Sequence, residues 1–98
     1  MTLKLVLCTQ SMVPHFIAKL SCEFGNLAIK HQVGHIESAH VDDITYKFFS
    51  PDVHVGRIQG TCPDEIIIHE SCEIQPKLMQ ELEMRLTPRN GRITYEQW

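Results

Sequence analysis

Histidine and cysteine are the side chains with which this chain could do acid–base or nucleophilic chemistry, and it holds six of the first and four of the second. A thiol is a good nucleophile when a neighbouring histidine or other cation stabilises its thiolate. Cys62 is the candidate nucleophile, because it lies in a loop before a β-branched run and next to Pro63. His35 is the candidate base, with His40 and His69 as alternatives. The sequence alone does not show which of them lies beside the thiol.

The remaining cysteines fit packing positions better than a metal site. Cys8 ends an apolar strand pattern and Cys22 lies inside a helical pattern, so both are predicted to be structural thiols. Cys62, His69 and Cys72 could supply three metal ligands, but their spacing matches no common zinc motif. The sequence indicates no metal and no cofactor.

Composition limits the class of protein. The 98 residues make one domain, residues 1–98, with 43% hydrophobic and 21% charged residues. A formal net charge of −3, with Lys and Arg scattered, argues against nucleic acid as a partner. The apolar start is too short for an export signal, and no stretch could span a membrane. We therefore expect a cytoplasmic protein with reduced thiols.

Hydrophobic periodicity predicts a strand over residues 2–8 and a helix over 13–24, with Pro14 in its first turn and Gly25 as its stop. Residues 31–46 are predicted to form the first half of a β-hairpin, with an extended segment from Val33 to Val41, a turn at 42–43 and the start of the returning strand. The returning strand carries Ile44, Tyr46 and Phe48. The link over 27–30 has no clear pattern.

The second half of the chain indicates a short strand within 53–58, a buried strand over 65–69 and a helix that begins at Pro76. Asn90-Gly91 then turns the chain into a short aromatic tail. The predicted order is β-α-β-β-β-β-α. It describes an α+β domain in which two helices pack on an antiparallel sheet of about four to five strands.

Three short phrases carry a resemblance to a known family. They are Gly34-His35-Ile36-Glu37, Val55-Gly56-Arg57-Ile58 and the segment 90–98, NGRITYEQW. In this order they resemble the circularly permuted, papain-like cysteine hydrolases of the NlpC superfamily, especially small phage and bacterial members. The resemblance implies that His35 stands where that family has its catalytic histidine.

The departure from that family concerns the nucleophile. In the permuted family the catalytic cysteine lies beyond the turn that resembles residues 90–98, at the start of a further helix, and this sequence has no residue after Trp98. A base without a nucleophile or an oxyanion donor does not make an acyl-transfer site. The resemblance therefore implies a trimmed, non-catalytic version of the fold.

Two functional classes follow. In the first, the chain is a small non-catalytic protein-binding module, such as a phage or mobile-element inhibitor that covers a host protein with a basic surface. The expected contacts are Tyr46, Glu81, Tyr95 and Trp98, beside an acidic, solvated face that could meet a basic partner and consists of Glu65, Glu70, Glu73, Glu81 and Glu83. In the second, it is a small cysteine-dependent hydrolase, amidase- or peptidase-like, that uses Cys62 and His35. Homodimerisation through an open sheet edge is compatible with either class.

Overall fold

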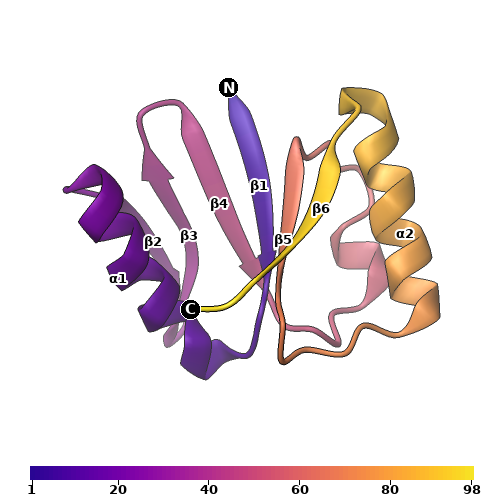
Figure 1. Cartoon of the computed structure of the whole chain (residues 1–98), viewed down its shortest axis with the longest axis horizontal. Helices are drawn as coiled ribbons and strands as arrows, with labels where there is room; N and C mark the ends of the chain where they lie inside the picture. The colour runs from indigo at the N-terminus through magenta and orange to yellow at the C-terminus, as the bar shows by residue number, and fades with distance from the viewer.

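The computed structural model describes the whole chain, residues 1–98, as one mixed β-sheet with a helix on each face (Figure 1). The sheet has six strands in the order β2-β3-β4-β1-β5-β6. The elements are β1 (Thr2–Leu7), α1 (Val13–Phe24), β2 (Ala28–Gln32), β3 (His35–Val41), β4 (Ile44–Phe49), β5 (Glu65–His69), α2 (Pro76–Leu86) and β6 (Arg92–Glu96). Short 3-10 turns cover Gln10–Met12, Val55–Arg57 and Thr87–Arg89.

The α+β class with two helices is confirmed, but the prediction of an antiparallel sheet of four to five strands is wrong. Strand β1 pairs in parallel with both β4 and β5, and β6 pairs in parallel with β5. Only β2, β3 and β4 form an antiparallel meander. Parallel pairing needs a long crossover. Helix α1 with the β2–β3 hairpin supplies the crossover from β1 to β4, and α2 supplies the one from β5 to β6.

Three segments differ from their predicted structure. Residues 53–58 form a loop with a 3-10 turn and not a strand. Their apolar character is explained by Val53 and Ile58, which are buried in the core although neither pairs with a strand. Residues 28–32, which lack a pattern, form strand β2 with every residue exposed. The aromatic tail contains β6, which completes the sheet beside β5.

Alternation along β1 divides the core into two layers on opposite faces of the sheet. Val6 packs on the α1 side with Phe16, Leu20 and Tyr46. Leu5 and Leu7 point the other way; with them on the α2 side are Ile66, Ile68, Leu78, Leu82 and Leu86. Because β1 and β5 are covered on both faces, they are almost continuously apolar. The central strands thus pack against core residues on both faces of the sheet. This packing and the pairing of β1 with β4 fix the carboxyl ends of these two strands, where the candidate site lies.

Candidate functional site

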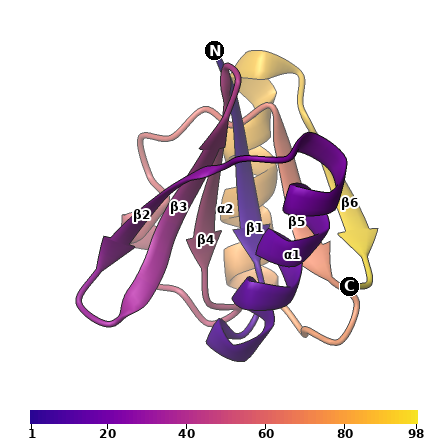
Figure 2. The same cartoon turned by 90° about the vertical axis from the view of Figure 1, so that its left-hand side faces the viewer.

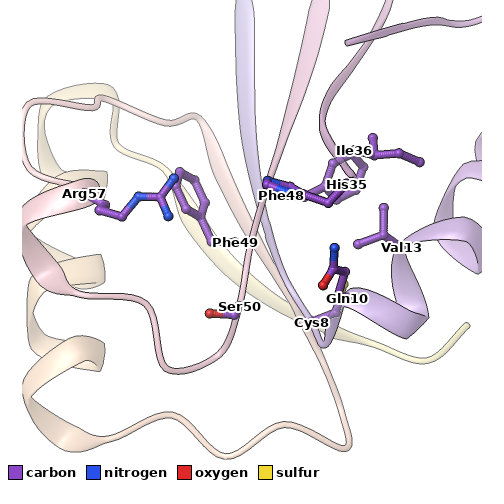
Figure 3. Close-up of a pocket in the computed structure, with 9 residues that line it drawn as sticks. All are labelled: Cys8, Gln10, Val13, His35, Ile36, Phe48, Phe49, Ser50 and Arg57. Carbon is purple, nitrogen blue, oxygen red and sulfur yellow. The ribbon is translucent and has the colours of Figure 1, made fainter. Parts of the chain in front are cut away.

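A pocket of about 180 Å³ opens where the parallel strands β1 and β4 end. Open sheets of this kind commonly bind ligands outside the carboxyl ends of their parallel strands. The lining residues come from four stretches of the chain; they are Cys8, Gln10, Val13, His35, Ile36, Phe48, Phe49, Ser50 and Arg57. In Figure 3, Arg57 and Phe49 lie on one side of the strands, and His35, Ile36 and Val13 on the other.

The floor of the pocket is held by the pairing of β1 with β4. The Cys8 N–H donates to the Phe49 carbonyl at 3.1 Å, so the two strands end at the same level. After Cys8 the chain makes one 3-10 turn and enters α1, whose first turn contains Pro14. That short connection places Gln10 and Val13 at the rim. Because Val13 is the first residue of α1, the positive end of the helix dipole lies close to the pocket.

His35 reaches the pocket because the β2–β3 hairpin turns immediately before it. Val33 and Gly34 both have positive φ, +30° and +80°, as the tightest two-residue hairpin turns require. Gly34 adopts this backbone at no cost, whereas a β-branched residue such as Val33 is strained there. The Nδ1 atom of His35 lies 3.3 Å from the Val33 carbonyl oxygen. This contact leaves Nε2 as the ring nitrogen without a protein partner.

Arg57 brings a fixed positive charge to the opposite rim. It ends the 3-10 turn Val55–Arg57, and its guanidinium carbon lies 6.0 Å from the centre of the Phe49 ring, within cation–π range. Ser50 contributes a hydroxyl, which donates to Asp52 at 2.7 Å. None of the nine lining residues is acidic. The pocket therefore offers hydrogen-bond donors and positive charge against an apolar wall.

The thiol of Cys8 is part of that wall and is not an activated nucleophile. Burial raises the pKa of Cys8 to about 12, with a smaller contribution from the nearby Cys72 thiol. A thiol with such a pKa is protonated at neutral pH. The structure thus brings His35 to a cysteine, but to an unreactive one.

The structure does not bring His35 together with Cys62. Cys62 is exposed and lies two residues before Asp64, which is bound to the amino end of β1. The Asp64 N–H donates to the Leu3 carbonyl, and the Leu3 N–H donates to the Asp64 carboxylate. His35 lies beside Cys8, at the other end of β1. Five residues of strand separate these levels, about 16 Å. That separation leaves no geometric basis for a Cys62–His35 dyad.

The two alternative bases are also occupied elsewhere. His40 lies between Ser38 and Thr45, with ring nitrogens 3.2 and 3.1 Å from their hydroxyl oxygens. The buried His69 accepts the Ser71 N–H at Nδ1, and its Nε2 lies 3.4 Å from the Trp98 carbonyl. Both rings therefore join neighbouring parts of the fold.

The residues predicted to contact a partner are mostly used inside the molecule. Tyr46 is only 4% exposed. Trp98 packs edge-to-face on Phe16 and donates from Nε1 to the Met12 carbonyl at 3.1 Å. Glu81 pairs with Arg85 along α2 at 3.0 Å. Tyr95, 53% exposed on the edge strand β6, is the one large side chain of the set that faces solvent.

The predicted acidic face is interrupted, because Glu65 belongs to the interior. Its carboxylate accepts from Thr94 at 2.7 Å and lies 3.1 Å from the ammonium of Lys4 and 3.3 Å from Arg92 Nε. Burial by itself would raise the pKa of Glu65, but these hydrogen bonds outweigh it and lower the pKa. Glu65 therefore joins three strands and is not available to a partner.

The most open feature of the molecule is strand β2, which the sequence pattern did not reveal. It pairs with β3 alone, and all five of its residues are exposed. Figure 2 shows β2 at the outer margin of the sheet, away from both helices. Large exposed apolar side chains lie close to it in the chain: Phe24, Ile29 and Val33. An exposed strand has no one-sided apolar alternation, which is the signal that periodicity would need.

Comparisons with protein-family models, with curated protein sequences and with solved structures found no match to this chain. They do not bear on the resemblance to permuted papain-like hydrolases, which stays a prediction. At 12 residues α1 is the longer helix, and neither helix has the length and apolar character needed to cross a bilayer.

Proposed function

We propose that this chain is a small non-catalytic protein-binding module that adds an extended segment of its partner to the free edge of β2. The observation that carries the proposal is the state of β2: one side of its backbone is paired with β3, and the other side faces solvent along the whole strand. Such an edge can accept another strand through main-chain hydrogen bonds.

The charge of β2 favours an acidic segment as the partner. The strand AIKHQ contains Lys30 and His31 and no acidic residue. Lys30 has one carboxylate neighbour, Glu37 on β3, at 3.7 Å and with both side chains largely solvated, so this pair offers little competition. This proposal differs from the basic partner surface that composition suggests, because the free edge is cationic although the whole chain is acidic.

A second copy of the chain fits this edge less well than a different protein. Two antiparallel β2 strands would bring the lysines at position 30 close together, and like charges across a sheet are destabilising. The register of β2 also shifts between Lys30 and His31. Bulges and lysines on an edge discourage unspecific strand pairing, which supports a selective partner. A host protein bound in this way would have its extended segment covered by this chain, which is how an inhibitor could block that segment.

The alternative function, a cysteine-dependent hydrolase, has less support. It needs a thiolate beside a base, and the cysteine that lines the same pocket as His35 is Cys8, whose raised pKa keeps it protonated.

Site-specific photocrosslinking in cells tests the proposal. A photoreactive residue is placed at Gln32, on β2, and in a matched protein at Glu83, on the exposed side of α2. The proposal expects one defined crosslinked protein from position 32 and none from position 83. Lys30→Glu should abolish that product, whereas Lys77→Glu, an exposed lysine on α2, should leave it unchanged.

Three outcomes would contradict the proposal. The same products from positions 32 and 83 would show unspecific contact. A product that still forms with Lys30→Glu would show that the positive charge of Lys30 does not select an acidic partner segment. A product made of two copies of this chain would assign the β2 edge to homodimerisation instead.

A further inference from the structure

We infer that the pocket at the carboxyl ends of β1 and β4 binds the anionic group of a small molecule, a phosphate or a carboxylate, with Arg57 as its principal contact. This site is separate from the β2 edge and does not depend on the proposed partner. Arg57 has no acidic partner, and the lining, position and size of the pocket all suit an anionic group.

Arg57 differs from every other arginine of the chain. Arg85, Arg89 and Arg92 each lie within 4.0 Å of a carboxylate oxygen. Arg57 forms no ion pair and rests against the face of Phe49. A guanidinium presents several N–H donors in a fixed plane that matches two oxygens of a carboxylate or phosphate. The cation–π contact with Phe49 does not use the N–H donors of the guanidinium, so they stay available to a ligand.

The other polar groups of the pocket complement an anion. Gln10 contributes an amide and His35 a ring whose Nε2 has no protein partner, whereas the Ser50 hydroxyl already donates to Asp52. The acidic residues next to the lining segments, Glu37 and Asp52, do not line the pocket; Glu37 lies 3.7 Å from Lys30, and Asp52 accepts the Ser50 hydroxyl. A site with four polar side chains and no carboxylate is unexpected in a chain with a net charge of −3.

The position of the pocket in the fold points to the same ligand chemistry. It lies at the carboxyl ends of two parallel strands and next to the start of α1. The amino end of a helix carries partial positive charge, although in α1 the Val13 N–H donates to the Gln10 carbonyl and Pro14 has no N–H. The dipole of α1 therefore adds to the field of Arg57. Val13, Ile36 and Phe48 supply the apolar part of the lining.

The size of the pocket limits the ligand. The pocket has a volume of about 180 Å³, which is room for a small group only. A phosphate group or a short carboxylic acid fits inside, whereas a whole nucleotide would have to leave most of its atoms outside. We therefore expect recognition of the anionic group and of a small apolar body next to it.

Nuclear magnetic resonance titrations of the full chain with sodium phosphate and with sodium benzoate, at constant ionic strength, test the inference. The expected result is saturable shifts of the amides of Gln10, Ser50 and Arg57. Arg57→Gln should weaken binding at least tenfold, and Arg57→Lys should keep part of it. Arg89→Gln, which changes an exposed arginine outside the pocket, is the matched control and should bind as the original chain does.

The two probes also separate the possible ligands. Saturation by phosphate alone supports a phosphate ester, and saturation by benzoate alone supports an aromatic or aliphatic carboxylate. Shifts that rise linearly with either salt, or equal affinity in Arg57→Gln, would overturn the inference. Circular dichroism of each variant keeps the result interpretable. If Arg57→Gln does not fold, the comparison of Arg57→Lys with the Arg89→Gln control decides.

Discussion

The carboxylate of Glu65 should be a measurable source of stability, and Glu65→Gln tests it. Glu65 is 7% exposed and binds groups on both neighbouring strands, β1 and β6. A glutamine can still accept from Thr94, but its amide also places donors toward the ammonium of Lys4. Arg92 is 79% exposed at its side chain and returns to water at little cost. The loss is therefore dominated by the Lys4 contact, about 2 kcal/mol of unfolding free energy.

The pH dependence of that loss follows from the pKa of Glu65. Burial raises this pKa, but the hydrogen bonds from Thr94, Lys4 and Arg92 prevail and hold it below the ordinary value of 4.5. A carboxyl group with a lowered folded pKa stabilises the fold above its unfolded pKa and loses that contribution as the pH falls through the folded pKa. The difference between the original chain and Glu65→Gln should thus be complete at pH 7 and shrink well below pH 4.5.

Urea unfolding followed by the fluorescence of Trp98, at pH 7 and at pH 3, measures both effects. Glu83→Gln removes an exposed carboxylate from α2 and is the matched control, with an expected change within about 0.5 kcal/mol at either pH. A loss under about 0.5 kcal/mol for Glu65→Gln at pH 7 would refute the reasoning about the ion pair. A loss of equal size at pH 3 would show that packing, not charge, is responsible.

Three further changes test other parts of the fold. Gly91→Ala should reduce the free energy of unfolding by about 2 kcal/mol, and thus the melting temperature, because the new Cβ would lie 2.7 Å from the Asp64 carbonyl oxygen. Val33→Asn should stabilise the chain by about 1 kcal/mol in urea unfolding, because asparagine tolerates the positive φ at this position. In alkylation at pH 8 mapped by mass spectrometry, the buried Cys8, with a pKa of about 12, should react at least about 100-fold more slowly than the exposed Cys62.

The local elements were determined by the sequence itself. Periodicity placed a helix over 13–24 and a buried strand over 65–69, and the structure confirms both as α1 and β5. The turns at 42–43 and 90–91 are confirmed as well: Asp42 and Asn90 have positive φ, which these residue types tolerate. Such features depend on neighbours within a few residues, so the local pattern contains what is needed to predict them.

Only the tertiary structure decided the pairing of the strands and the surroundings of the candidate residues. An apolar run such as 65–69 suits a parallel or an antiparallel neighbour equally, and the choice depends on crossovers from distant parts of the chain. The same crossovers place His35 beside Cys8 rather than Cys62, bury Tyr46 under α1 and leave Arg57 without a carboxylate. Proximity between segments tens of residues apart is a property of the assembled sheet, and no local pattern in the sequence encodes it.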